Sequence, residues 1–320
     1  MLKLRLYLEN YTETQDDEMT FTSYDSHFSE SSPCNIYIVG SRPRVIIDNN
    51  FCEVENNHIK LLFKVQKGHD FQEIYGKIPL NRVPSGKIVI ESNFPFSRFN
   101  LKDDSGYFFD KADYPNNEEV NLKASYALRV AEIDTENFYF SDLKALYIGK
   151  SLKQDKRISP VKRVKSHSRI QAVLNKCVAK YTDQEVYILL CSFVHKVDLI
   201  ATSEELREIG NKTKITERIQ KDLATLNANT ELMTQISEAA LIDYFNTKEF
   251  NCDFIGSFGR KTHFYYQPII KSKLDYISLE IDTTKLSRIY TDSIEAKYFH
   301  SLKYFPKEQF KREINDHIWS

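Results

Sequence analysis

The chain has 320 residues, and its 44 Lys and Arg nearly balance 45 Asp and Glu, so the net charge of -1 by itself neither favours nor excludes a class of partner. A chain of this length can hold two domains and bury ordinary hydrophobic cores. The five cysteines are scattered and lack the spacing of a zinc site or a disulfide framework. The N-terminus carries no apolar leader, and no apolar stretch is long enough to span a bilayer. We therefore expect a cytoplasmic protein with no membrane partner.

Short strand patterns fill the chain up to about residue 116. Residues 2–8 alternate strictly between apolar and polar side chains, which is typical of a half-buried strand. Similar runs follow, separated by turn signals such as Pro84-Ser85-Gly86. The pattern predicts a mostly β domain of sandwich or barrel type over residues 1–116, with a recognition or scaffold role. The further runs are 35–39, 44–48, 59–66 and 87–91.

A strand followed by a helix is predicted after residue 143. Residues 144–148 read as a short strand, which Gly149 ends where the backbone must turn or approach another group closely. Ser159-Pro160 then offers an N-cap and a first-turn proline, so a helix is expected to begin there. On that helix Arg163 and His167 fall on one stripe with apolar residues further along. This places two polar groups at the start of a helix that packs on a sheet.

A second helix carries a carboxylate on its apolar stripe. Residues 186–193 read as a strand that is buried on both faces, and residues 230–245 as the helix. Glu238 shares a stripe with Leu241 and Ile242, and a buried carboxylate needs a cation, either a metal ion or Arg163. Asn251 follows closely enough to bond near Glu238 or to fix the exiting loop. Beyond it, we expect strands over 262–270 and 276–282, then amphipathic segments over 292–305 and 307–318.

Basic residues are concentrated between positions 144 and 169, where Asp155 is the one acid. Basic side chains in the first turn of a helix oppose its dipole, and bound phosphates would offset that cost. This local run predicts nucleic acid as the partner. Its members are Lys144, Lys150, Lys153, Lys156, Arg157, Lys162, Arg163, Lys165 and Arg169.

Taken in order, these residues resemble the GIY-YIG nuclease family. Tyr147-Ile148-Gly149 match its second signature, and the family's helix arginine, histidine, glutamate and asparagine correspond to Arg163, His167, Glu238 and Asn251. For the first signature, Gly-Ile-Tyr, the best counterpart is Ser125-Tyr126-Ala127, with Tyr139 as a rival.

The resemblance implies an α+β fold in which a small antiparallel sheet is flanked by helices. We expect this nuclease-like domain over residues 117–320, with a core at about 124–254 and an α/β extension over 255–320.

The resemblance also implies roles for these residues. Glu238 would bind Mg²⁺ or Mn²⁺, and Arg163 would neutralise charge on the phosphate in the transition state. Tyr126 or Tyr147 would take the proton of the attacking water, with His167 as an auxiliary. The predicted substrate-binding residues are Lys150, Lys162, Lys165, Arg169 and Asn251.

Two functions follow as expectations. The first is a divalent-metal-dependent endonuclease that hydrolyses phosphodiester bonds, with DNA favoured over RNA, in the context of prokaryotic restriction, defence or mobile elements. The alternative is a non-catalytic nucleic-acid-binding or assembly protein on a nuclease-like scaffold that has lost the first tyrosine. In either case the N-terminal domain is a candidate surface for a homodimer or a protein partner.

Overall fold

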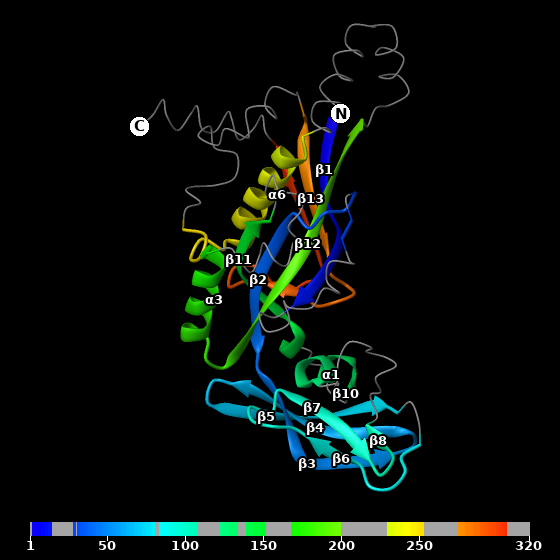
Figure 1. Ribbon diagram of the computed structural model, residues 1–320. Coiled ribbons are helices and arrows are strands. Elements are labelled where there is room, and N and C mark those ends of the chain that lie inside the picture. The colour runs from blue at the N-terminus through cyan, green and yellow to red at the C-terminus, as the bar shows by residue number, and fades with distance from the viewer. Residues whose placement is uncertain are drawn as a thin grey trace, which may run out of the picture. The chain divides into compact units, whose positions relative to one another are not determined.

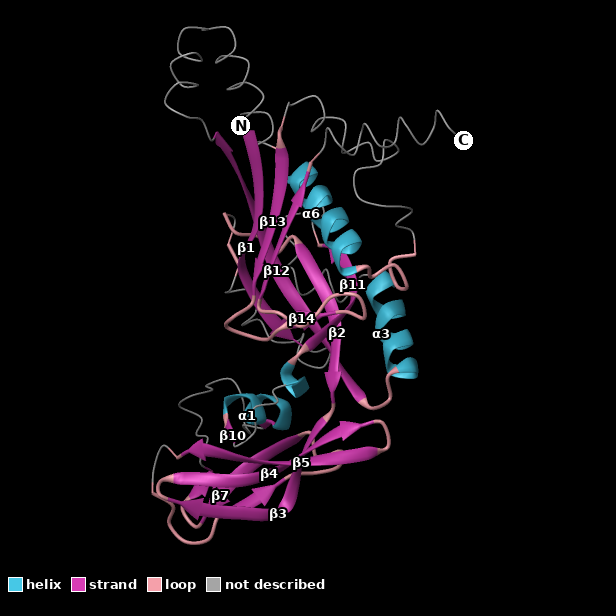
Figure 2. Ribbon diagram, turned by 180° about the vertical axis from the view of Figure 1, so that it is seen from behind, coloured by secondary structure: helices cyan, strands magenta, loops and turns pink. Residues whose placement is uncertain are grey.

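A computed structural model of the protein describes residues 2–14, 28–29, 31–80, 83–107, 122–133, 139–151, 168–199, 229–252 and 274–305. The chain divides into two compact units. Unit 1 comprises residues 1–41, 143–176 and 186–320, and unit 2 comprises residues 42–142 and 177–185. Strands dominate the described part of both units, helices are few, and the larger sheet is mixed, so the fold is mostly β (Figure 2).

The division differs from the predicted boundary at residue 116. Residues 1–41 do not join the strands that follow them, because β1 (Leu2–Thr14) pairs with β12 (Gln184–Leu199) and β13 (Tyr276–Asp282). Most of unit 2, residues 42–142, is therefore inserted between β2 and β11 of unit 1, and residues 177–185 join it from later in the chain. An alternating pattern fixes which face of a strand is buried, but it does not say which sheet the strand joins.

The sheet of unit 1 has seven strands in the order β14-β11-β2-β12-β1-β13-β15 (Figure 1). It is mixed, since β1 runs antiparallel to β12 and parallel to β13. The sequence predicted a small antiparallel sheet, whereas this sheet is larger and mixed. The remaining strands are β2 (Ile36–Pro43), β11 (Leu143–Lys150), β14 (Ile289–Tyr290) and β15 (Phe299–Tyr304).

Helix α6 (Thr230–Phe245) covers one face of this sheet (Figure 1). The side chain of Asn229 caps its first turn by accepting the N–H of Leu232, and the helix ends at Asn246, which adopts the left-handed conformation. Its apolar residues join Leu4 and Leu6 of β1 in one buried core. Helix α3 (Ser168–Lys180) begins in unit 1, and its residues from 177 on are grouped with unit 2.

Unit 2 has a hydrophobic core of its own, in which Phe63 and Phe99 pack edge to face. One of its sheets has the order β10-β5-β4-β3, and in the other β7 pairs with β6, β8 and β9. Helix α1 (Ala124–Val130) packs against them. The strands are β3 (Val45–Glu55), β4 (His58–Lys67), β5 (Asp70–Pro79), β6 (Val89–Glu91), β7 (Arg98–Asp103), β8 (Gly106–Tyr107), β9 (Leu122–Lys123) and β10 (Glu132–Ile133).

A buried histidine joins β15 to α6. His300 is 1% exposed, its Nε2 donates to the carbonyl of Lys297 at 3.0 Å, and its Nδ1 lies 3.0 Å from the hydroxyl of Tyr244. Because Nε2 must carry a proton to donate, Nδ1 of the neutral ring accepts from Tyr244. Burial of the ring lowers the pKa of His300 below its ordinary value.

Unit 1 is therefore expected to lose stability in acid through His300. His300 of the unfolded chain is protonated as pH falls through about 6.5, whereas in the folded chain the lower pKa delays protonation to more acidic pH. The free energy of unfolding therefore decreases as pH falls below about 6.5. Urea unfolding of wild type and His300→Gln between neutral and mildly acidic pH tests this. The stability advantage of wild type should shrink as pH falls, and an advantage that is constant with pH would contradict the assignment.

Candidate functional site

Two tyrosines face each other on neighbouring strands of unit 1. Strands β2 and β11 pair antiparallel, with Tyr37 opposite Gly149 and Val39 opposite Tyr147. The rings of Tyr37 and Tyr147 have centroids 6.0 Å apart and are tilted by 37°. Both side chains are buried, at 1% and 6% exposure. Strand β2, which precedes residues 42–142 of unit 2, therefore places Tyr37 beside Tyr147 of β11, which follows them.

Tyr126, which the sequence interpretation paired with Tyr147, lies in another part of the structure. Tyr126 lies in helix α1 of unit 2, is 47% exposed, and its ring lies 5.3 Å from the guanidinium of Arg129. The rival, Tyr139, lies in a 3-10 turn, also in unit 2. Among the described residues, β11 pairs with β2 and β14, so neither tyrosine lies on a strand beside Tyr147. Their assignment to a first signature stays a prediction.

Gly149 is required by the position of Tyr37. A Cβ atom at residue 149 would lie 2.3 Å from the hydroxyl oxygen of Tyr37 and 2.5 Å from its Cζ. Any side chain there would displace the tyrosine ring, since protein interiors are close-packed. The glycine of the Tyr-Ile-Gly signature thus lets the Tyr37 hydroxyl lie directly against the backbone of β11.

Glu238 meets the same strand one residue further on. Its Oε1 accepts the backbone N–H of Lys150 at 3.0 Å. Glu238 is half-buried on α6, as its apolar stripe predicted, and the bond to Lys150 ties its carboxylate to the end of β11. The Tyr37 hydroxyl and the Glu238 carboxylate thus contact neighbouring residues of β11, although Tyr37 belongs to the sheet face turned away from α6 and Glu238 lies on α6.

The side chain of Asn251, predicted either to bind substrate or to fix the loop after the helix, bonds to the backbone of β11. Its Oδ1 accepts the N–H of Ile148 at 3.1 Å, and its Nδ2 donates to the carbonyl of Ile148 at 2.7 Å. The hydroxyl of Thr247 donates to the same Oδ1 at 2.9 Å. The amide is buried and bonds to the backbone of β11 as a neighbouring strand would. It fixes the end of α6 against the strand that carries Tyr147.

Asn35 makes a matching contact at the start of β2. Its Nδ2 donates to the carbonyl of Phe193 at 2.6 Å, and its Oδ1 accepts the N–H of Phe193 at 2.8 Å. Its own carbonyl accepts the N–H of Ser151 at 2.9 Å. Asn35 thus ties β12 and the end of β11 to a point two residues before Tyr37. The sequence interpretation named neither Asn35 nor Tyr37 as a site residue, although it predicted a strand over residues 35–39.

The remaining predicted site residues are only partly described. Lys150 is exposed at the end of β11. Arg169 belongs to α3, but its side chain is not described. Lys162, Arg163, Lys165 and His167 lie outside the described residues, so their places in the site stay predictions.

A divalent cation is compatible with Glu238. Among the described residues, no group of three or more His, Cys, Asp or Glu side chains is arranged to hold a metal ion. Mg²⁺ does not need such a cage, because it commonly binds through one or two carboxylates while keeping several waters. With one oxygen accepting the N–H of Lys150, the Glu238 carboxylate is a fixed, hard oxygen ligand of the kind that Mg²⁺ and Mn²⁺ accept.

Comparisons with protein-family models, curated proteins and solved structures found no match for this chain. Within the described ranges, none of the helices combines the length and apolar character needed to cross a membrane. The function is therefore inferred from the arrangement of Tyr37, Tyr147, Gly149, Glu238 and Asn251.

Proposed function

We propose that unit 1 is a divalent-metal-dependent endonuclease of the GIY-YIG type, which hydrolyses phosphodiester bonds of nucleic acid, with DNA favoured over RNA. The observation that carries the proposal is the pairing of β2 with β11, which brings an Ile-Tyr strand and a Tyr-Ile-Gly strand together. Asn35-Ile36-Tyr37 then serves as the first signature, with asparagine in place of glycine. The order of signatures, helix glutamate and asparagine matches the family pattern.

The proposed roles follow from the chemistry of each group. A Mg²⁺ or Mn²⁺ ion held by Glu238 would supply Lewis-acid stabilisation of charge on a phosphate oxygen. Tyr37 or Tyr147 takes the proton of the attacking water, and a cation near the phenol is needed because the ordinary pKa of tyrosine is about 10. Lys150 and His167 are the groups assigned to that task. Arg163 stabilises the charge on the transition state.

The alternative is a non-catalytic nucleic-acid-binding or assembly protein. Its support is the burial of both tyrosines, since a general base must reach a water molecule and Tyr37 is only 1% exposed. Prokaryotic restriction, defence or mobile-element biology, a cytoplasmic location, and a homodimer or protein partner are proposals that accompany either function. We assign to unit 2 the recognition or scaffold role that the sequence predicted for residues 1–116.

Cleavage of plasmid and single-stranded DNA with Mg²⁺ or Mn²⁺ at low salt tests the proposal. Glu238→Gln is the sharpest variant, because its amide oxygen can still accept the N–H of Lys150 while the charge is lost. We expect it to lower the cleavage rate about a hundredfold or more, and Arg163→Ala to do the same. The control is Glu231→Gln, an exposed position in the first turn of the same helix, which should cleave as wild type does.

Two outcomes oppose the proposal. Metal-independent cleavage, or full activity in Glu238→Gln, would show that Glu238 is not the ligand of a catalytic metal ion. A folded wild type that binds DNA but cuts neither substrate with either metal would favour the non-catalytic alternative.

A further inference from the structure

The face of the seven-stranded sheet that is turned away from α6 carries a basic row. Leu4 and Leu6 of β1 enter the core with α6, so the alternate residues Lys3 and Arg5 lie on the other face. The register places Arg5 beside Lys196 of β12 and beside Ser278 of β13, and it places Ser278 beside Lys303 of β15. One row thus crosses four neighbouring strands. We call Lys3, Arg5, Lys196 and Lys303 the basic face.

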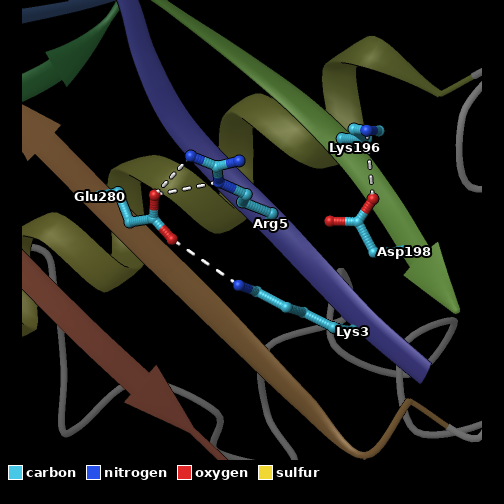
Figure 3. Close-up of polar contacts among 5 residues, drawn as sticks. All are labelled: Lys3, Arg5, Lys196, Asp198 and Glu280. Carbon is cyan, nitrogen blue, oxygen red and sulfur yellow. Dashed lines mark hydrogen bonds and ion pairs between the residues drawn. The ribbon is translucent and has the colours of Figure 1, made fainter. Parts of the chain in front are cut away.

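Three of these four cations pair with two carboxylates. Arg5 donates to Oε2 of Glu280 through Nε at 2.9 Å and through Nη2 at 2.8 Å, and Lys3 lies 3.7 Å from Oε1 of the same side chain (Figure 3). Lys196 pairs with Asp198 at 3.4 Å (Figure 3). The face therefore carries an excess of positive charge, which is complementary to phosphate. The next acid along β13, Asp282, stands at the end of the strand and is bound by Thr284.

The most accessible cations are available to a ligand. The side chain of Lys196 is 66% exposed and that of Arg5 is 40% exposed. Lys303 is exposed on the edge strand β15, with its ammonium 5.8 Å from the centre of the Tyr276 ring. A long lysine or arginine side chain can reach a phosphate oxygen without giving up the packing of its stem.

Aromatic rings flank this charge on β15. Phe299, Ser301 and Lys303 share the outer side of the strand, while His300 and Leu302 turn toward the core, and Phe305 follows directly after the strand ends. Phe299 is 54% exposed and Phe305 is 43% exposed. Nucleic-acid bases stack on exposed rings of this kind when they are not already stacked in a duplex.

The same sheet face leads to the tyrosine pair. Ile36 and Ile38 of β2 enter the core with Leu4 and Leu6, so Tyr37 lies on the face that carries the basic row. Strand β12, which carries Lys196, lies between β2 and β1. The start of β2 meets β12 at Phe193, three residues before Lys196, so a polynucleotide bound to the row would have to turn along β12 to approach Tyr37.

We infer that the basic face binds single-stranded nucleic acid, with phosphates at Arg5, Lys196 and Lys303 and bases stacked on Phe299 and Phe305. The inference rests on the proposed function for the identity of its ligand as substrate, and it adds the strand state that the site accepts. Rings on a sheet surface require unstacked bases, so a duplex could use only the cations.

Binding can be measured without cleavage. Fluorescence anisotropy with a labelled single-stranded oligonucleotide of mixed sequence, and with the matching duplex, is recorded in EDTA over a salt series. The test variant is Lys196→Glu/Lys303→Glu, and the matched control is Lys67→Glu/Lys87→Glu, which makes the same change of charge at exposed positions of unit 2. A second variant, Phe299→Ala/Phe305→Ala, removes both rings.

The basic-face reversal should weaken single-strand binding about tenfold or more and lower the salt slope by about 1.4, which corresponds to two lost contacts with single-strand phosphates. The control should bind as wild type does, and the loss of both rings should weaken binding of the single strand but not of the duplex. Equal losses in the control, or tighter wild-type binding of the duplex, would overturn the inference. Single-strand binding that follows this pattern without any cleavage in Mg²⁺ would overturn the nuclease proposal and leave this one standing.

Discussion

Replacing Tyr37 by phenylalanine is expected to lower the rate of phosphodiester cleavage about a hundredfold or more. The substitution keeps the ring that packs beside Tyr147 and removes only the hydroxyl that lies against Gly149. A general base contributes a factor of about 10² to 10⁴ to the rate of such reactions. Unfolding by urea should change little, because the ring remains in place.

The matched control is Tyr126→Phe, the same change at the tyrosine that the sequence favoured. Tyr126 lies on the surface of α1, so this variant should cleave at the wild-type rate. Initial rates on plasmid substrate in Mg²⁺ measure both. If Tyr126→Phe is inactive and Tyr37→Phe is active, the assignment of the first signature to β2 is wrong.

Asn251→Ala is expected to destabilise unit 1 by about 3 kcal/mol or more. The substitution leaves both the N–H and the C=O of Ile148 without the partners that Asn251 provides. An orphaned buried polar group costs about 1 to 3 kcal/mol, and there are two here. Cleavage should also fall at temperatures where the protein is still folded, because α6 carries Glu238 and loses its anchor to β11.

Thr247→Val is a milder change at the same contact, with which the destabilisation in Asn251→Ala can be compared. It removes only the hydroxyl that donates to Oδ1 of Asn251, so a loss of about 1 kcal/mol is expected. Urea unfolding followed by circular dichroism measures both variants. A loss in Asn251→Ala no larger than that in Thr247→Val would show that the amide does not hold α6 to the strand.

Local patterns predicted many of the elements. The strand over residues 276–282 and the helix over 230–245 match β13 and α6, and the run at 144–148 lies within β11. The half-buried position of Glu238 also follows from its stripe on that helix. These predictions worked because periodicity reports directly on which side of an element is buried.

Pairing between distant strands was not readable in the same way. Tyr37 and Gly149 are opposite each other although unit 2 separates them, and no local signal encodes a partner that far along the chain. The role of Asn251 was also hidden, because a sequence cannot show whether an amide meets backbone or ligand. The predicted strand at 262–270, the helix start at 159–160 and the segment 307–318 lie outside the described residues.

The insertion of unit 2 between β2 and β11 also bears on the order in which the protein folds. Ser41 and Lys144 are direct partners across the two strands, so their pairing closes a loop of about a hundred residues, and contacts between such distant segments form slowly. Unit 2 has its own core. Once it has folded, the conformational search by which β2 and β11 find each other is much smaller than in a random chain. We expect the tyrosine pair to assemble after unit 2 has folded. A partly synthesised chain on the ribosome would then contain a folded unit 2 before the Tyr37–Tyr147 pair has formed.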